Sequence, residues 1–211
     1  MNILDIHTHR LPAEPGQAIQ NCQPAEFIPL GGAYYSVGIH PWYLTRENFV
    51  RQWELLLSAI HSPQVLAIGE AGLDKLAQTD YVLQQEAFEK QAILAHEMGY
   101  PLVIHAVRSA DEIIRFKRKM QPSNPWIIHG FRGKKELALQ YIREGIYLSL
   151  GEKYQEEALR QIPAEYLFLE TDESLIDIHS LYKRAALLPE VSVCKLMQQV
   201  QQNINNVFFR Q

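Results

Sequence analysis

Cysteine is scarce in this chain. Its 211 residues include two cysteines, Cys22 and Cys194, and neither belongs to a CxxC pair or to a Cys/His spacing. Disulfide frameworks and thiolate zinc sites need several cysteines at short, regular spacings. The sequence therefore argues against both kinds of site, and a reducing cytoplasm fits it best.

Long hydrophobic runs and an excess of basic charge are also missing. No stretch approaches the roughly 20 apolar residues of a membrane span, and the start, MNILDIHTHR, shows no basic leader before an apolar segment. The formal net charge of −4 argues against a broad basic surface for nucleic acid. We therefore expect a soluble, non-exported protein whose contacts with nucleic acid, if any, are local. The sequence points to no obligate protein partner.

What the chain does have is a regular alternation of two kinds of segment. Hydrophobic residues make up 47% of it, which is enough for a sizeable core, and the length favours a single domain over residues 1–211. Short apolar runs alternate with longer amphipathic stretches, a pattern typical of parallel strands joined by helices. The predicted strands are 3–6, 18–21, 34–39, 65–69, 102–104, 126–128, 146–150 and 167–169. The predicted helices are 47–60, 81–98, 110–120, 134–144, 155–161, 181–188 and 193–209.

Eight strands with intervening helices predict an α/β fold, a TIM-type (β/α)8 barrel. The chain is near the lower limit of about 200 residues for this fold, so the barrel should be compact and somewhat trimmed. The trimming is expected between Arg10 and Tyr34, where Pro12, Pro15 and Pro24 leave no room for two ordinary helices. We expect loops there.

The stretch 81–98 is the most secure helix. Apolar residues recur in it at roughly helical spacing, and a glycine and a proline follow it as stop signals. These residues are Val82, Leu83, Phe88, Ile93, Leu94, Gly99 and Pro101. We assign its glutamines, Gln84, Gln85 and Gln91, to a solvated face.

Histidine and carboxylate residues gather where the predicted strands end. They are His7 and His9 after the first strand, His40 after the third, Glu70 after the fourth, His105 after the fifth, His129 after the sixth and Asp172 after the eighth. The carboxyl ends of all strands in a parallel barrel open on one face, and residues i and i+2 of a strand point the same way. Imidazoles and carboxylates suit zinc, manganese or similar ions, and two such ions can activate a water. The sequence therefore predicts a two-cation site at the mouth of the barrel.

A single histidine at a strand end more often packs in a core or loop than binds a metal. The joint pattern favours the metal site, because burying so many imidazoles and carboxylates without a cation would be costly. His61, His96 and His179 fall on or beside predicted helices and receive no role.

Several motifs occur in order over most of residues 1–172. They are DIHTHR, GIHPW, IGEAGLDK, VIHAVRSADE, WIIHGFRG and LETD. Together they resemble those of the TatD family of metal-dependent hydrolases, within the amidohydrolase-like barrel superfamily. Members of that family are described as magnesium-dependent deoxyribonucleases, often acting from the 3′ end, and some as D-aminoacyl-tRNA deacylases.

The resemblance implies a role for each matching residue. His7, His9, Glu70 and Asp172 would hold one divalent cation, and Glu70 would also reach a second cation held by His105 and His129. Glu70 and Asp172 would be the catalytic carboxylates, with Asp172 as general base toward a metal-activated water. The resemblance does not distinguish Mg, Mn and Zn.

The chain departs from the family pattern in two segments. The segment between His9 and His40 is much shorter than usual, and the motif ETDESLIDIH lacks the small residue, proline and aromatic that usually follow the last ligand. The chain is also tens of residues shorter than a typical member. The metal set is complete, whereas the substrate-facing set is altered.

Other residues carry weaker predictions. Arg108 and Arg132 follow His105 and His129 by three residues, so either they grip a phosphate or carboxylate of the substrate or they form surface salt bridges. His40 is predicted to meet the substrate or its leaving group. Asp74 and Glu170 are candidates to orient ligand histidines, and Trp42 and Phe131 either stack on a base or, as is more common, pack.

Three functions remain open at this point. The first is a phosphodiesterase or deoxyribonuclease that acts on a small phosphodiester or a nucleic-acid end. The second is a metal-dependent hydrolase of a carboxylic ester or amide, such as an aminoacyl ester or a lactone, which the acidic charge and the short front segment favour. The third is a metal-binding barrel without catalysis.

Overall fold

A computed structural model describes residues 3–12, 14–188 and 190–209 of the chain. Eight parallel strands follow one another in chain order around a single sheet. The strands are β1 (Asp5–Thr8), β2 (Ala18–Cys22), β3 (Tyr34–Val37), β4 (Val65–Asp74), β5 (Leu102–Val107), β6 (Trp126–Ile128), β7 (Ile146–Leu150) and β8 (Leu167–Leu169). The α-helices are α1 (Phe49–Ala59), α2 (Tyr81–Met98), α3 (Ala110–Met120), α4 (Lys135–Arg143), α5 (Glu156–Leu159), α6 (Ile178–Leu187) and α7 (Val193–Phe208).

The sheet closes on itself where the chain leaves β8 and meets β1. The Asp172 N–H donates to the carbonyl of His7 at 2.9 Å, and the His9 N–H donates to the carbonyl of Asp172 at 3.2 Å. These bonds form a parallel bridge between Thr8 and Asp172. The predicted TIM-type (β/α)8 barrel is confirmed, and its closure brings the ends of β1 and β8 into direct contact.

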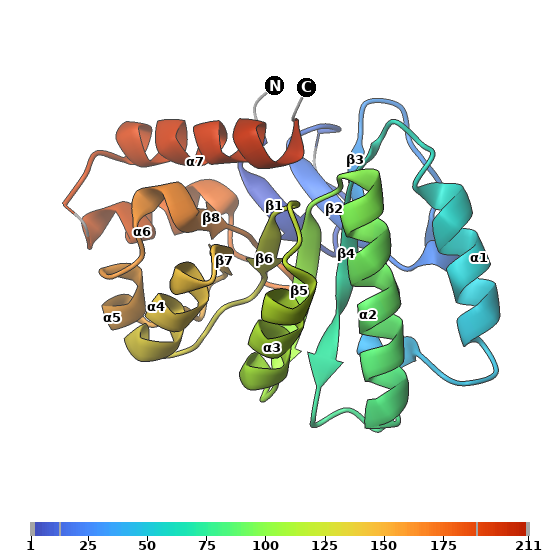
Figure 1. The fold of residues 1–211 in the computed structure, drawn as a ribbon. Helices are drawn as coiled ribbons and strands as arrows, with labels where there is room; N and C mark the ends of the chain where they lie inside the picture. The colour runs from blue at the N-terminus through green and yellow to red at the C-terminus, as the bar shows by residue number, and fades with distance from the viewer. Residues whose placement is uncertain (1–2, 13, 189, 210–211) are drawn as a thin grey trace.

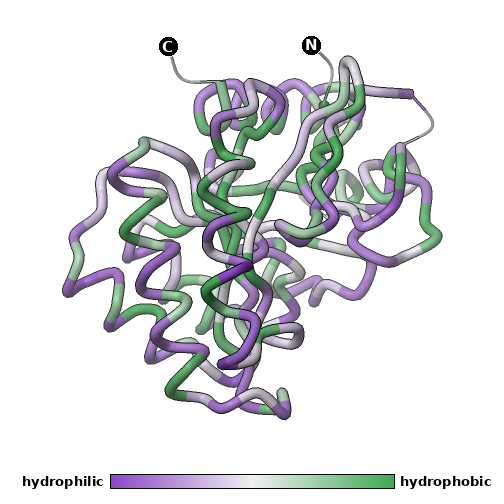
Figure 2. The backbone as a smooth tube through the Cα atoms, turned by 90° about the vertical axis from the view of Figure 1, so that its right-hand side faces the viewer, coloured by the Kyte–Doolittle hydropathy of each residue, from purple (hydrophilic) through white to green (hydrophobic). Residues whose placement is uncertain are grey.

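The core lies inside the barrel and between the strands and the surrounding helices. Strands covered on both faces lack the apolar–polar alternation of a half-exposed strand, and β4 is buried at every residue although it carries Glu70 and Asp74. Figure 2 shows the same separation, with hydrophobic segments through the centre and hydrophilic ones along the periphery. No helix within the described ranges is long and apolar enough to cross a membrane.

One end of the barrel is covered by α7, and the other is left to the loops. In Figure 1, α7 lies across the top, whereas the arrow of β4 points to the bottom. The α7 residue Asn203 donates to the carbonyls of Ala164 and Leu167, just before and at the start of β8, at 2.7 and 2.9 Å. The mouth formed by the carboxyl ends of the strands is therefore the open end.

Most element boundaries lie within a few residues of those expected, and the exceptions concern the site. Strand β4 continues to Asp74 and β5 to Val107, so Glu70 and His105 lie within strands instead of following them. Helix α6 begins before the predicted residue 181 because the Asp177 side chain accepts from the Ser180 N–H and caps it. The residues described between β1 and β3 hold β2 and one 3-10 turn, η1 (Pro24–Glu26), as the lack of room for ordinary helices predicts.

The predicted faces of α2 are wrong in part. Gln84 and Gln91 were assigned to solvent but are buried, with exposed fractions of 1% and 0%, whereas the apolar Val82 and Ile93 are exposed. Gln85, between them, is half-buried. The physical reason is that both buried glutamines hydrogen-bond backbone groups of neighbouring segments, which offsets the cost of burying an amide.

Candidate metal centre and active site

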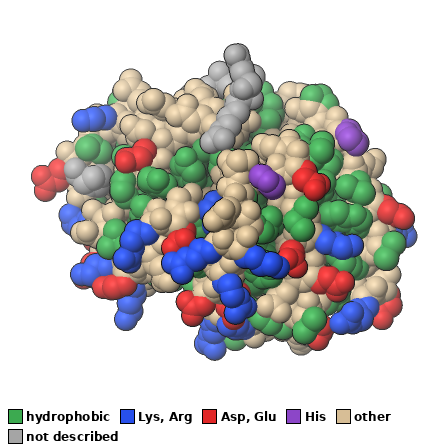
Figure 3. Space-filling model, in the orientation of Figure 1, with side chains coloured by type: hydrophobic (Ala, Val, Ile, Leu, Met, Phe, Trp, Pro, Cys, Tyr) green, Lys and Arg blue, Asp and Glu red, His purple; other side chains and the backbone are tan. Residues whose placement is uncertain are grey.

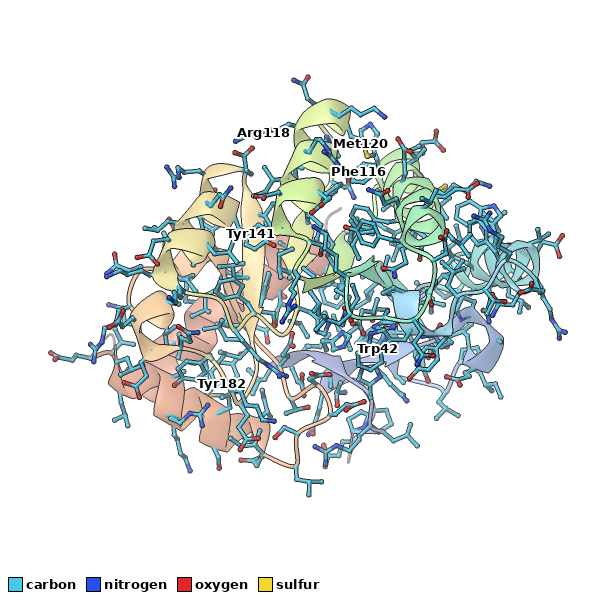
Figure 4. All side chains as sticks on the ribbon, turned by 90° about the horizontal axis from the view of Figure 1, so that it is seen from below. Trp42, Phe116, Arg118, Met120, Tyr141 and Tyr182 are labelled. Carbon is cyan, nitrogen blue, oxygen red and sulfur yellow. The ribbon has the colours of Figure 1, made fainter. Side chains whose placement is uncertain are left out.

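The six residues predicted as metal ligands meet at the mouth of the barrel. They come from β1 (His7), the residue after its end (His9), β4 (Glu70), β5 (His105), the residue after β6 (His129) and the bridge after β8 (Asp172). We call these six residues the ligand cluster. Figure 4 looks along the barrel from below, toward the end where they meet.

Glu70 is the centre of the cluster, because each of its carboxylate oxygens faces a different group of imidazoles. Oε1 lies 2.6 Å from His129 Nε2 and 2.7 Å from His105 Nδ1. Oε2 lies 3.5 Å from His7 Nε2 and 3.6 Å from His9 Nε2. One carboxylate therefore joins two groups of nitrogen donors, which is the arrangement that a shared, bridging ligand requires.

Asp172 completes the group that contains His7 and His9. Its Oδ1 lies 3.5 Å from His9 Nε2 and 4.0 Å from His7 Nε2, and its backbone adopts a positive φ of 54°. Asp is among the few side chains that tolerate this left-handed region, because its short polar side chain bonds locally. The turn directs the carboxylate back over the end of β1, and the side chain stays 22% exposed to the cleft.

The donors of the cluster fit divalent cations. Among the described residues, neither ring nitrogen of the fully buried His7 has a hydrogen-bond partner. A buried nitrogen without a partner costs free energy unless a ligand satisfies it. Imidazole nitrogens and carboxylate oxygens are donors that zinc, manganese and similar ions accept, and four groups of the site's residues bring such atoms within 4.8 Å of one another.

The electrostatics of the cluster also call for positive charge. Burial opposes ionisation of Glu70, yet the imidazoles of His129, His105 and His40 hold the pKa of its carboxyl well below the ordinary value. Burial likewise opposes protonation of His129, yet the carboxylates of Glu70 and Glu170 raise the pKa of its imidazole well above the ordinary value. The carboxylates thus stabilise a cation at this point of the mouth.

Asp74 holds His105 from the side opposite Glu70. Its Oδ2 lies 3.1 Å from His105 Nε2, and the same oxygen accepts from the indole N–H of Trp42 at 2.6 Å. A carboxylate behind a ligand imidazole fixes its tautomer and its orientation. The prediction that Asp74 could orient a histidine agrees with this contact, and the link to Trp42 was not foreseen.

Glu170 supports His129 in the same way. Its Oε1 lies 3.3 Å from His129 Nδ1 and accepts the Gly130 N–H at 2.6 Å. The side chain is fully buried. Each of the two imidazoles therefore lies between two carboxylates: His105 between Glu70 and Asp74, and His129 between Glu70 and Glu170.

His40 lines the cleft but is largely buried, and its role at the substrate stays a prediction. It is 4% exposed, its Nε2 lies 3.0 Å from Glu70 Oε1, and its Nδ1 accepts the Trp42 N–H at 3.1 Å. Accepting at Nδ1 leaves the proton on Nε2, which donates to Glu70. Burial lowers the pKa of His40 even though Glu70 opposes this, so the neutral form that the two contacts require is favoured.

The two buried glutamines of α2 fix the backbone beside these side chains. Gln91 accepts the Ile39 N–H at 2.7 Å and donates to the Ile39 carbonyl at 3.1 Å, one residue before His40. Gln84 does the same for Asp74, at 2.8 and 3.1 Å. Helix α2 thereby anchors the two chain segments that carry His40 and Asp74.

A buried carboxyl at the β1–β8 closure was missed by the sequence interpretation. Asp5 accepts from the hydroxyl of Thr171 at 2.7 Å and from its N–H at 3.1 Å, and the same hydroxyl lies 3.1 Å from that of Thr8. Burial raises the pKa of Asp5 to about 7, although the Thr171 bonds oppose the change. Its place in DIHTHR, two residues before His7, was the available signal, and its contact with the far end of the chain appears only in the structure.

A cleft of about 710 Å³ opens over the ligand cluster. Arg108 and Arg132 both line it, and Lys153, which the sequence interpretation did not consider, joins them. Arg132 lies 3.8 Å from Asp172 Oδ2. It therefore pairs with a carboxylate and at the same time lines the cleft in which a substrate would bind. Acidic and basic side chains are interspersed over the face shown in Figure 3.

The two aromatic residues named from the sequence differ in position. Phe131 is 4% exposed and packs edge-on against Tyr141, with ring centroids 6.1 Å apart. Trp42 is 55% exposed at the cleft, so packing does not account for it.

Comparison with known proteins identifies relatives over most of the chain. The family model described as "TatD related DNase" matches residues 25–208. A Bacillus subtilis protein named "Uncharacterized metal-dependent hydrolase YabD" is 30% identical over 77% of this chain and 65% of its own length. An Edwardsiella piscicida protein named "3'-5' ssDNA/RNA exonuclease TatD" is 33% identical over 71% of this chain and 63% of its own length.

The matched stretches cover less than two thirds of these relatives: 65% of the Bacillus subtilis protein and 63% of the Edwardsiella piscicida protein. Among solved structures, the Escherichia coli TatD homologue YjjV superimposes with a TM-score of 0.82 at 17% identity, over 99% of this chain and 98% of that one. A TatD family hydrolase from Entamoeba histolytica gives a TM-score of 0.72 at 22% identity, over 84% of this chain and 75% of that one. Both likenesses support the barrel fold.

Proposed function

The chain belongs to the family of TatD-related DNases, and on that premise we propose that it is a metal-dependent hydrolase that cleaves phosphodiester bonds at a nucleic-acid end. The observation that carries the proposal is the position of Glu70. Its two oxygens face two separate groups of imidazoles, His105 with His129 and His7 with His9. That geometry suits a pair of cations that share one carboxylate.

In this proposal, His7, His9, Glu70 and Asp172 would hold one divalent cation, and Glu70, His105 and His129 would hold the second. The two cations, when bound, would supply the Lewis acidity that activates a water and stabilises negative charge on the phosphate. The hydrogen bonds of Asp74 and Glu170 keep His105 and His129 in the ligating orientation.

Asp172 is the proposed general base. Its Oδ1 faces His9, whereas its Oδ2 faces the cleft beside Arg132, and its side chain is 22% exposed. A carboxylate oxygen that is open to the cleft can take the proton of the attacking water. Arg132 lies 3.8 Å from Asp172 and can contact a non-bridging phosphate oxygen.

A carboxylic ester or amide is the second candidate bond, and the mixed charge of the cleft favours it. Glu152 and Glu173 line the same cleft as the arginines, and a long polyanion would be repelled by these carboxylates. The phosphodiester of a short end exposes less charge than a long strand does, so the first candidate remains the stronger.

The experiment gives the purified protein single-stranded oligonucleotides and a panel of carboxylic esters, with magnesium, manganese or zinc. We expect nucleotide release to depend on the cation and to be lost in His105→Ala. His96→Ala is the matched control, because His96 is exposed on α2 and, among the described residues, its ring hydrogen-bonds only to Ser123. Preference for a carboxylic ester would support the second candidate, and stoichiometric metal without turnover of any substrate would support a non-catalytic barrel.

A further inference from the structure

The mouth of the barrel has two chemically different walls. Three basic residues, Arg108, Arg132 and Lys153, line the cleft from the loops after β5, β6 and β7, and they outnumber the one carboxylate of these loops that also lines it, Glu152. Aromatic residues come from the loop after β3, where Trp42 and Tyr43 line the same cleft and are 55% and 57% exposed. The ligand cluster lies between the two walls.

Trp42 is exposed and yet held at a fixed position. Its indole N–H donates to Asp74 Oδ2 at 2.6 Å, and its backbone N–H donates to His40 Nδ1 at 3.1 Å. Its ring also lies edge-on to those of His40 and His105, with centroids 5.1 and 5.6 Å apart. Holding a large aromatic ring in place leaves little side-chain entropy to lose when a ligand covers it.

An aromatic ring that stays exposed in the free protein does not contribute the free energy that its burial would provide. A ring that is fixed beside a hydrolytic site is therefore best explained by a ligand that covers it. Every nucleobase has a flat face that stacks on such a ring, whatever its sequence. In Figure 4, Trp42 lies beside the middle of the barrel mouth, whereas Arg118 lies at the periphery.

We propose that Trp42 is a stacking platform for the nucleobase next to the scissile phosphodiester, with the phosphate backbone directed toward the basic wall opposite. This inference rests on the proposed function and deepens it, because it assigns a base-contacting residue and predicts a need for a base at the cleaved end. Asp74 has two tasks in this arrangement: one oxygen orients both the platform and the His105 imidazole.

The test compares an ordinary oligonucleotide with one whose terminal or penultimate nucleotide lacks its base. We expect the wild-type protein to show a KM roughly ten-fold or more higher for the abasic end. Trp42→Ala should remove this preference by weakening binding of the ordinary end alone, and Trp42→Phe should keep most of it, because phenylalanine retains an aromatic face. Trp53→Phe, on the distant helix α1, is the matched control and should behave as wild type.

A binding measurement keeps the inference separate from the hydrolytic activity. In the Trp53→Phe protein, fluorescence from Trp42 should be quenched in a saturable way by adenosine monophosphate and not by ribose 5-phosphate. The other tryptophan, Trp126, is fully buried and out of contact with added ligand.

Two results would overturn the inference. One is an equal loss of kcat on ordinary and abasic ends in Trp42→Ala, which would mean that the ring acts only through Asp74 and His105. The other is the absence of any difference between the nucleotide and the sugar phosphate. If the wild-type protein cleaves neither oligonucleotide, the proposed function fails, and quenching by adenosine monophosphate still decides whether the platform exists.

Discussion

The ligand cluster and the rim of the cleft are neighbours, yet they are built in opposite ways. Glu70 and His7 are 2% and 0% exposed and lie in strands, whereas Trp42 and Arg132 are more than half exposed and lie in the connections that follow strands. In a barrel, strands fix the position of reacting groups and loops adapt to the molecule that is bound. From this contrast we expect changes in the buried framework to affect the proposed chemistry and changes at the rim to affect the choice of substrate.

The largest effect should come from Glu70, where the two halves of the cluster meet. Glu70→Gln keeps the shape of the side chain but removes the charge that faces five imidazoles. We expect kcat/KM to fall by roughly 10³-fold or more, with loss of bound cation. Steady-state kinetics with saturating manganese will measure this, and retention of more than a tenth of the activity would show that Glu70 is not the shared ligand.

A smaller effect should follow from Asp74→Asn, which leaves every ligand in place. The amide cannot accept from Trp42 and His105 with the strength of a carboxylate, so His105 should lose its fixed orientation. We expect about 10- to 100-fold weaker cation binding. Titration calorimetry will measure the affinity for the cation in the wild-type and Asp74→Asn proteins. Trp42→Phe is the control, because it removes only the hydrogen bond from the indole to Asp74. If the two variants lose the same affinity, the loss comes from Trp42 and not from the orientation of His105.

The anchoring of the site by α2 can be tested through stability. Gln91→Leu preserves the size of the side chain but leaves the buried N–H and carbonyl of Ile39 unpaired. We expect a loss of about 2 kcal/mol in the free energy of unfolding, which lowers Tm by roughly 2–4 °C for each kcal/mol. The half-buried Gln85 offers the matched change, Gln85→Leu, which should alter Tm little; equal shifts in the two variants would contradict the anchoring role.

The smallest effect is expected at the rim. Arg132 is 56% exposed and 3.8 Å from Asp172, so solvent screens the pair. Arg132→Ala should raise KM by roughly five-fold, an effect that shrinks as salt is added. Arg118→Ala removes a comparably exposed arginine, paired with Glu144 on the outside of the barrel, and should leave KM unchanged. A large fall in kcat instead of a rise in KM would move Arg132 into the catalytic machinery.

Much of the framework could be predicted from the sequence, because it depends on local patterns. Apolar runs located all eight strands, and the histidines and carboxylates near their carboxyl ends converge because the strands are parallel. The extension of β4 past Glu70 was missed, since a buried strand with polar ligands loses the apolar signature on which the prediction relied. The metal roles of the six ligands remain a prediction.

The parts that could not be predicted depend on contacts between distant residues. Gln91 pairs with Ile39, 52 residues away, and Thr171 with Asp5, 166 residues away. A glutamine on a helix is polar wherever it points, so composition cannot tell a solvated face from a backbone anchor. The contact of Asp74 with both Trp42 and His105 likewise depends on how the end of β4 packs against β5 and against the segment after β3.

The central claim is the pair of cations, and metal content tests it most directly. Protein dialysed against zinc or manganese should hold two equivalents per chain by elemental analysis, and saturation at about 100 times Kd should stabilise the fold by about 2.7 kcal/mol. Glu70→Gln should lose both the stoichiometry and the stabilisation. Fewer than one equivalent in the wild-type protein, with no rise in Tm on adding any divalent cation, would contradict the account.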